Sequence, residues 1–164
     1  MVKSRKTGIE VRVGLEKLWQ VMSKPKDLAA ISAKLVPEQI IDMQVVEGDG
    51  GVGTILLYVP SSISGLSDAS YKEKIAELDA TRHEIGFEYV EGGFLNRGFS
   101  YFKIGAQLCA KGEHRTEVNL KISYESDNDE ETTQQLIQKA ESAAFNLLRN
   151  LEKYLSNGLA TSSD

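Results

Sequence analysis

One carboxylate, Glu73, lies in a strand-like segment on the side that should face the protein interior. Side chains in the segment Tyr71–Glu77 alternate between two faces, so Glu73 shares a face with Tyr71 and Ile75, and its lysine neighbours share the other. If the lysines face water, Glu73 points inward. A carboxylate on an apolar wall loses hydration, which raises its pKa, and it then donates a hydrogen bond as an acid or accepts one from a ligand. The alternative is a wet or lysine-paired Glu73 at a cavity mouth, without a specific role.

The other reactive side chains are scattered along the chain. His83 and His114 fall in predicted turns, where a histidine is most often exposed to solvent. Together with the single cysteine, Cys109, they show no metal-ligand spacing and form no Ser-His-Asp arrangement. We therefore expect no metal site and no cofactor.

A glycine-rich segment, Val46–Thr54, lies between two strand-like runs. A phosphate-binding loop needs a helix N-terminus behind it, and a P-loop also needs a Lys followed by Ser or Thr. Because the apolar run Ile55–Val59 follows instead, the segment is interpreted as a flexible turn between strands. Its glycines permit positive φ angles, and they are Gly48, Gly50, Gly51 and Gly53.

Two short helices and seven strands are predicted from the spacing of apolar residues. Helical spacing recurs in 15–22 and again in 28–35, before Pro37 ends the pattern. Strand-like segments separated by turn residues then follow in hairpin order, which predicts an antiparallel sheet. Including one before the helices, the strand-like segments are Gly8–Val13, Ile40–Val46, Thr54–Val59, Tyr71–Leu78, Glu84–Val90, Phe99–Cys109 and Thr116–Tyr124.

A long amphipathic helix closes the chain. Its apolar stripe runs from Leu136 to Leu155, acidic residues precede it, and Gly158 marks its expected end. A helix of about 40 Å must lay this stripe across the concave face of the sheet to bury it. We predict one α+β domain over 1–158, in which the seven-stranded antiparallel sheet wraps around the helix in a helix-grip, START-like arrangement. A disordered tail is expected at 159–164.

A sheet that grips a helix can be solid or hollow. In a hollow fold, the aromatic and aliphatic side chains of the inner face line a pocket for flat apolar ligands. The aromatic cluster is most simply a solid core, and the hollow fold is the alternative at this point. In the hollow fold, Glu73 is the polar anchor and Pro60–Ala69 forms a mobile rim. The ligand-binding residues expected beside Glu73 in that case are Met22, Tyr71, Ile85, Phe87, Tyr89, Phe102, Ile104, Ala144, Leu147, Leu148 and Leu151.

Composition limits the class of partner. The 164 residues carry a formal net charge of −5, which opposes binding to nucleic acid or to anionic membrane surfaces. No apolar run reaches the roughly 20 residues of a membrane span, and no secretory leader is apparent. A single cysteine cannot form an internal disulfide, so a cytoplasmic protein is expected. We expect a monomer or a weak dimer. Its expected partner is a small apolar or amphipathic ligand.

Several sequence motifs resemble motifs of the plant class-10 pathogenesis-related proteins, the birch pollen allergen superfamily. The likeness spans nearly the whole chain, and the glycine-rich segment is typical of the superfamily. The motifs are VEGDGGVGTI at 46–55, SYKEK at 70–74, EGGFL at 91–95 and the closing LEKYLSNG. The resemblance implies an intracellular plant protein that encloses a small ligand between sheet and helix.

One branch that the chain resembles contains the cytokinin-specific and other phytohormone-binding proteins. The shared motifs include HEIG at 83–86 and VNLKISY at 118–124. The hormone-anchoring glutamate of that branch falls on Glu73, whereas its hormone-holding threonine and tyrosine fall on Ala144 and Leu147. The resemblance implies binding of a cytokinin, a gibberellin or a specialised metabolite in a more apolar pocket.

The alternative is an enzyme similar to norcoclaurine synthase, which joins an arylethylamine to an aldehyde. The tyrosine and glutamate of that enzyme match Tyr71 and Glu73, but its catalytic lysine and aspartate align with Ile85 and Ile104. An aliphatic side chain cannot polarise a carbonyl as an ammonium does, so that mechanism is not expected in its known form. Glu73 with Tyr71 could instead serve as a general acid or base on an alkaloid or terpenoid intermediate.

Overall fold

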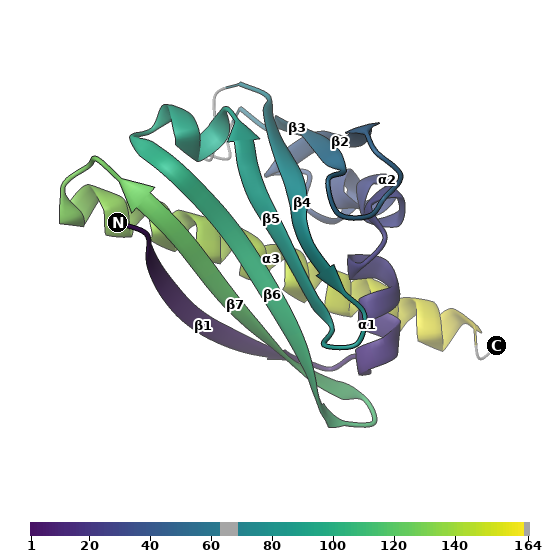
Figure 1. Ribbon diagram of the computed structural model, residues 1–164. Helices are drawn as coiled ribbons and strands as arrows, with labels where there is room; N and C mark the ends of the chain where they lie inside the picture. The colour runs from purple at the N-terminus through teal and green to yellow at the C-terminus, as the bar shows by residue number, and fades with distance from the viewer. Residues whose placement is uncertain (63–68, 163–164) are drawn as a thin grey trace.

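Seven strands, three α-helices and a short 3-10 helix make up the protein, seen as a computed structural model in Figure 1. The structure describes residues 1–62 and 69–162, so the predicted rim at Pro60–Ala69 lies largely outside the described residues. The elements are β1 (Lys3–Val11), α1 (Leu15–Met22), α2 (Pro25–Leu35), β2 (Ile40–Glu47), β3 (Ile55–Pro60), β4 (Tyr71–Asp79), β5 (Glu84–Glu91), η1 (Gly93–Asn96), β6 (Phe99–Gly112), β7 (Arg115–Ser126) and α3 (Glu130–Ser162).

The strands form one antiparallel sheet in the order β1-β7-β6-β5-β4-β3-β2. Consecutive strands from β2 to β7 are neighbours, and β1 pairs with β7 along its full length, from Lys3 opposite Tyr124 to Val11 opposite Thr116. The predicted seven-stranded antiparallel sheet is therefore confirmed. β1 begins five residues earlier than predicted because an edge strand tolerates charged side chains that conceal its strand pattern.

The long helix α3 crosses the concave face of the sheet and lies behind the strands in Figure 1. Asp129 starts it, because its carboxylate accepts a hydrogen bond from the backbone N–H of Thr132 at 2.7 Å, which also lowers the Asp129 pKa. The helix extends to Ser162, so it ends four residues after the predicted end at Gly158. One internal glycine weakens a helix by only about 1 kcal/mol and does not have to end it.

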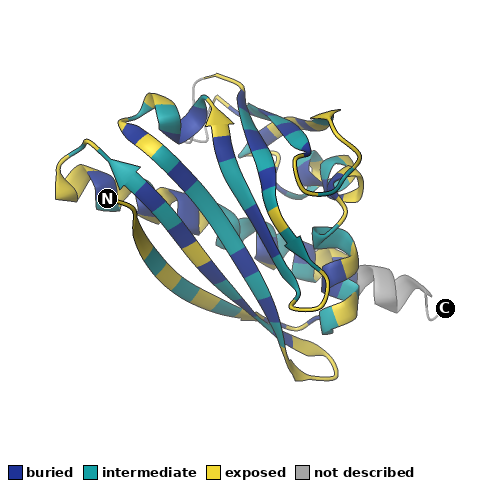
Figure 2. Cartoon of the chain, in the orientation of Figure 1, coloured by how far each residue is buried: buried dark blue, intermediate teal, exposed yellow. Residues whose placement is uncertain are grey.

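Buried side chains alternate along the strands, as the dark blue bands of Figure 2 show. The side chains that point toward α3 form two apolar clusters. One is centred on the aromatic residues of β3 to β6, and the other joins Trp19 of α1 to the C-terminal half of α3. The two clusters share partly buried side chains such as Phe87 and Leu35, and the interior between them is not completely filled.

The glycine-rich segment is a turn between β2 and β3, as predicted. Gly48, Gly50 and Gly53 have φ angles of 99°, 106° and 95°, whereas Gly51 does not adopt a positive φ. The backbone N–H of Gly50 donates to the hydroxyl of Thr54 at 2.8 Å, and that of Gly51 donates to the Asp49 carboxylate at 2.9 Å. Because side chains of the turn itself satisfy these donors, the turn is not built to hold a phosphate.

Candidate functional site

Glu73 lies in the middle of β4 and points toward α3, as the strand alternation predicts. Only 6% of the residue is exposed, and its face-sharing neighbours Tyr71 and Ile75 are buried as well. The flanking Lys72 and Lys74 lie on the outer face and are partly exposed. A carboxyl group is thus held inside the fold with no basic side chain beside it on its own strand face.

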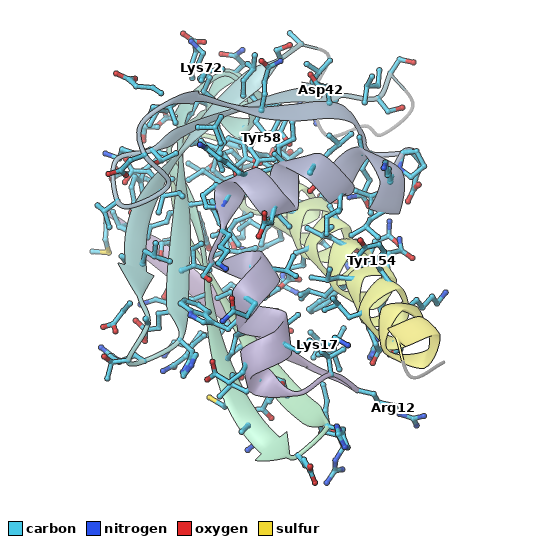
Figure 3. All side chains as sticks on the ribbon, turned by 90° about the vertical axis from the view of Figure 1, so that its right-hand side faces the viewer. Arg12, Lys17, Asp42, Tyr58, Lys72 and Tyr154 are labelled. Carbon is cyan, nitrogen blue, oxygen red and sulfur yellow. The ribbon has the colours of Figure 1, made fainter. Side chains whose placement is uncertain are left out.

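Three tyrosines from neighbouring strands surround this carboxyl group. Tyr58 of β3 is the direct cross-strand partner of Tyr71, and Tyr89 of β5 is the direct partner of Glu73. The rings of Tyr58 and Tyr71 stack at 5.0 Å, and those of Tyr71 and Tyr89 stack at 5.3 Å, within 10° of parallel in both pairs. Figure 3 shows Tyr58 on the helix side of the sheet, whereas Lys72 points away.

The tyrosine hydroxyls and the Glu73 carboxyl group form one hydrogen-bond network. The Tyr58 and Tyr89 hydroxyls bond to the carboxyl group, and the Tyr71 and Tyr89 hydroxyls bond to each other. When Glu73 is ionised, the Tyr58 and Tyr89 hydroxyls donate to its carboxylate, which keeps further lone pairs that can accept a hydrogen bond.

Burial controls the ionisation of these groups. Desolvation raises the pKa of Glu73 from 4.5 to about 7, although the hydrogen bonds from Tyr58 and Tyr89 lower it. Burial, followed by the nearby charge of Glu73, raises the pKa of Tyr71 above its ordinary value. The tyrosines therefore stay protonated near neutral pH, while Glu73 exchanges its proton in that range.

The network forms one wall of a cavity between the sheet and α3. The cavity has a volume of about 150 Å³, which is close to that of an apolar cavity that admits benzene. Pockets for drug-sized ligands are larger, at about 300–1,000 Å³. The lining is mostly apolar, and it consists of Met22, Leu28, Gln39, Ile40, Tyr58, Tyr71, Glu73, Phe87, Tyr89, Phe94, Ile104, Ala106, Leu120, Ala140, Ala143, Ala144, Leu147 and Leu148.

Most of the predicted binding residues lie in this lining, and three do not. Phe102 is packed behind the wall, where its ring stacks on Phe94 at 4.3 Å. Ile85 and Leu151 are 2% and 1% exposed, because they belong to the cluster around Trp19. Strand alternation and the helix stripe identified the inner face correctly, but they cannot separate a side chain that borders a void from one that is fully packed.

Gln39, between α2 and β2, is a lining residue that the sequence pattern did not reveal. Its side-chain oxygen accepts a hydrogen bond from Asn146 of α3 at 2.7 Å, and its amide group reaches the carbonyl of Ala143 at 3.4 Å. Asn146 also donates to Glu38 at 2.6 Å. These bonds fasten the α2–β2 connection to α3 over the cavity, and no local sequence pattern predicts a contact across more than 100 residues.

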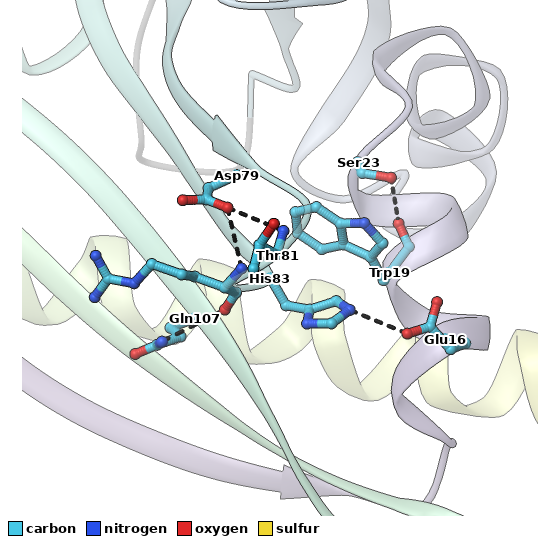
Figure 4. Close-up of polar contacts among 8 residues, drawn as sticks. Glu16, Trp19, Ser23, Asp79, Thr81, His83 and Gln107 are labelled. Carbon is cyan, nitrogen blue, oxygen red and sulfur yellow. Dashed lines mark hydrogen bonds and ion pairs between the residues drawn. The ribbon is translucent and has the colours of Figure 1, made fainter.

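His83 lies outside the cavity lining but is less exposed than predicted. Its side chain is 20% exposed, since its ring meets Trp19 edge-on at 5.3 Å, and Nε2 lies 3.0 Å from the Glu16 carboxylate (Figure 4). His83 therefore joins the β4–β5 turn to α1. In the part of the chain that the structure describes, no three Cys, His, Asp or Glu side chains are arranged to hold a metal ion.

An antiparallel sheet wrapped around one long helix, with a cavity between them, defines the helix-grip class of proteins. The profile of the pathogenesis-related protein Bet v 1 family matches residues 1–158, and the chain belongs to this family. None of the described helices is long and apolar enough to cross a membrane.

Relatives with a similar sequence include synthases and an allergen. Norbelladine synthase from Narcissus pseudonarcissus is 35% identical over 74% of this chain and 73% of its own length. S-norcoclaurine synthase 2 from Papaver somniferum is 26% identical over 75% of this chain, and that match spans 52% of the synthase. The major strawberry allergen Fra a 1-E from Fragaria ananassa is 24% identical over 76% of each chain.

Solved structures show the same fold. Norcoclaurine synthase from Thalictrum flavum, in complex with dopamine and hydroxybenzaldehyde, superposes with a TM-score of 0.78 at 22% identity, covering 96% of this chain and 88% of the synthase. Ara h 8.0201 superposes with a TM-score of 0.77 at 17% identity, covering 96% of this chain and 99% of its own. At these identities the likeness concerns the fold alone.

Proposed function

We propose that the protein binds a small, largely apolar molecule between the sheet and α3, and that Glu73 anchors this ligand. The observation that carries the proposal is a single carboxyl group, in a residue that is 6% exposed, on the wall of a mostly apolar cavity. Buried carboxyl groups without a cation are unfavourable in a domain that needs only a solid core. A ligand with an N–H or O–H donor accounts for this one.

The hydrogen-bond network favours donor ligands over acceptor ligands. Ionised Glu73 accepts from Tyr58 and Tyr89, and its carboxylate still has lone pairs that can accept a hydrogen bond from a ligand. An N–H or O–H group of the ligand would complete the carboxylate's hydrogen bonding. Cytokinins, gibberellins and specialised metabolites with amine or phenol groups combine such donors with an apolar body.

The volume of the cavity determines which of these ligands should bind without a rearrangement of the protein. At about 150 Å³ it admits one aromatic ring without rearrangement. A hormone-sized ligand requires α3 to move away from the sheet, which would disturb the contacts of Gln39 with α3. Single-ring amines and phenols are therefore expected to bind first, and larger ligands more slowly.

A matched pair of probes tests the anchor. 4-Methylphenol and toluene have nearly the same shape, but only the phenol carries a donor. We expect calorimetry to show tighter binding of 4-methylphenol to the wild type, a loss of about tenfold in Glu73→Gln, and unchanged toluene binding, because a charged acceptor bonds more strongly than an amide oxygen. Glu88→Gln, on the outer face of β5, is the control. An equal change for both probes would refute the anchoring role.

A second candidate function is proton transfer in a condensation of specialised metabolism. It is favoured by the Glu73 pKa of about 7, which suits a general acid or base at neutral pH, and by the 35% identity to a norbelladine synthase. Dopamine with 4-hydroxybenzaldehyde tests it beside Glu73→Ala. Turnover that disappears in the variant supports the enzyme, and binding without turnover supports the carrier.

A further inference from the structure

A second hollow is lined mainly by residues of the outer face of the sheet, which is the face opposite α3. That face is turned toward the viewer in Figure 1. We call this hollow the outer trough. Its volume is about 630 Å³, within the range of ligand pockets, and its lining includes side chains of β1, β4, β5, β6 and β7. Glu73 and α3 line only the cavity, and Lys6, Gly105 and Lys121 line only the outer trough, so substitutions at these residues test the two spaces separately.

The floor of the outer trough is formed by Gly105 of β6. Gly105 is the cross-strand partner of Gly86 on one side and of Lys121 on the other. A Cβ atom added at Gly105 would approach only two backbone oxygens, at 3.8 and 3.9 Å, so the space above this residue is open. A glycine inside a strand weakens the sheet and often marks a place where a ligand approaches the backbone closely.

Two lysines lie side by side in the two strands beyond Gly105 in the sheet, β7 and β1. Lys121 of β7 lies directly opposite Lys6 of β1, and both line the trough and are exposed. Neither has a carboxylate within ion-pair distance among the residues that the structure describes. Like charges directly opposite each other on a sheet are destabilising, and a bound anion would relieve this repulsion.

The acidic side chains of the trough already have partners. Glu77 pairs with Lys103, and Glu84 pairs with Arg82 at 3.0 Å. The carboxylates are therefore not available to neutralise Lys6 and Lys121.

The side-chain amide groups that line the trough, by contrast, make only long hydrogen bonds to the described residues. Gln107 donates to the Arg82 carbonyl at a long 3.4 Å, drawn as a dashed line in Figure 4, and among the described residues Asn119 donates to the sulfur of Cys109 at 3.7 Å. Two amides and two ammonium groups are thus available to donate hydrogen bonds. A ligand that fits this surface must be an anion with several acceptor oxygens.

We propose that the outer trough binds a small molecule that carries a phosphate or sulfate ester. The ester group lies between Lys6 and Lys121, and the organic body of the ligand covers Gly105. Among the described residues of the trough, the available ammonium and amide donors outnumber the available acceptors, whereas the whole protein has a net charge of −5. A small localised anion is therefore favoured over a long polyanion, which the rest of the surface repels.

Titration of the full chain with phenyl phosphate and phenyl sulfate, followed by amide NMR shifts, tests this site. We expect saturable shifts at Gly105 and Lys121 with at least one ester, and weaker saturation with inorganic phosphate, which lacks the organic body. The response to each ester shows whether phosphate, sulfate or both are accepted. Shifts confined to the surroundings of Glu73, or no saturation at millimolar ester, overturn the proposal.

Variants separate a specific site from general charge. Lys6→Gln with Lys121→Gln should weaken ester binding at least tenfold, whereas Lys153→Gln, an exposed lysine of α3, should leave it unchanged. Gly105→Val keeps the charge and suits a strand, but its side chain fills the floor, so it should also abolish binding. Equal losses in Lys153→Gln and the double variant, or full binding by Gly105→Val, would contradict the site.

Discussion

Glu73 of β4 lies directly opposite Tyr89 of β5, and the Tyr89 hydroxyl bonds to the Glu73 carboxyl group across this pair. Tyr58 makes the same kind of bond from β3. Burial favours the neutral acid, and the two hydroxyl groups favour the carboxylate. Because these effects oppose each other, the pKa of Glu73 is about 7 rather than far above it, and small changes in the tyrosines or in a ligand alter its charge.

The stability of the protein should fall as pH rises from about 4.5 to about 7. The folded protein holds the Glu73 proton more tightly than the unfolded chain does, so in this range the unfolded state binds fewer protons and the free energy of unfolding decreases with pH. A difference between 4.5 and about 7 corresponds to a penalty on the order of 3 kcal/mol at alkaline pH. Denaturant unfolding of the wild type and of Glu73→Gln at pH 5 and pH 8 measures it.

Glu73→Gln lacks the ionisable group, so its stability relative to the wild type should improve by about 2 kcal/mol between pH 5 and pH 8. Comparing the two proteins at each pH cancels the titration of all other groups. A constant difference at both pH values would show that Glu73 titrates normally in the folded state.

Tyr58→Phe should raise the pKa of Glu73 further. The substitution removes a hydroxyl group that stabilises the carboxylate, while the ring and its stacking on Tyr71 remain. Carboxyl-carbon NMR titration of the labelled protein follows the Glu73 pKa directly. Tyr154→Phe, at an exposed position of α3, is the matched control and should leave the titration midpoint unchanged.

Much of this arrangement was predictable from the sequence, because strand alternation depends on local geometry alone. The pattern placed Glu73 with Tyr71 and Ile75 on the inner face, and the structure buries all three. The seven strands and the gripping helix follow from the same periodicities. Family resemblance added the expectation of a hollow interior.

The three-tyrosine network was not predictable, because it depends on which residues face each other across neighbouring strands. The pairing of Tyr58 with Tyr71 is set by strand register, and β-bulges shift the register on both sides of this pair. A change of register by one residue moves a side chain to the other face of the sheet. The size of the cavity depends in turn on how closely α3 packs on the sheet, which no local pattern encodes.

Gly93→Ala should disturb the surroundings of the Glu73 carboxyl group, because Gly93 begins η1 shortly after β5 and lies against the Tyr89 ring. A Cβ atom at Gly93 would lie 2.6 Å from the Tyr89 ring, which stacking holds in place, and the φ angle of 59° is unfavourable for alanine. We expect a loss of at least about 2 kcal/mol in the free energy of unfolding, combining a steric clash with backbone strain. The Glu73 titration midpoint should shift as well.

Gly53→Ala is the control for this prediction. Its φ angle is 95°, and nothing lies within 4 Å of an added Cβ atom, so only the backbone strain is introduced. Both variants should lose stability, but Gly53→Ala should keep the wild-type titration of Glu73. A normal titration in Gly93→Ala would show that Tyr89 is not fixed by η1.

Ala144→Leu should fill the cavity and exclude ligands. Ala144 lies on the cavity-facing side of α3, and three added carbon atoms occupy a large part of a space suited to one ring. Binding of 4-methylphenol should become undetectable by calorimetry while the melting temperature stays within a few degrees of the wild type. Ser142→Leu makes a comparable change on the exposed side of the same helix. If Ser142→Leu abolishes binding equally, the ligand does not occupy this cavity.

Asn146→Ala should widen the range of ligands that the cavity accepts. The Asn146 amide group donates to Gln39 at 2.7 Å and to Glu38 at 2.6 Å, and these bonds connect α3 with the α2–β2 connection at the cavity wall. A ligand larger than one ring needs separation of α3 from this connection. Removing the amide eliminates two hydrogen bonds that oppose the movement, each worth about 1 kcal/mol.

The expected result is a several-fold faster association of a cytokinin such as zeatin with Asn146→Ala, measured by stopped-flow fluorescence, and unchanged association of 4-methylphenol. The small probe fits the cavity as it stands, so its binding does not depend on a movement of α3 away from the sheet. Asn150→Ala removes only a 3.3 Å bond to Asn146 on the same helix and should behave like the wild type. Faster binding of both probes in Asn146→Ala would indicate general loosening of the fold, because a gate that limits large ligands affects only the larger of the two.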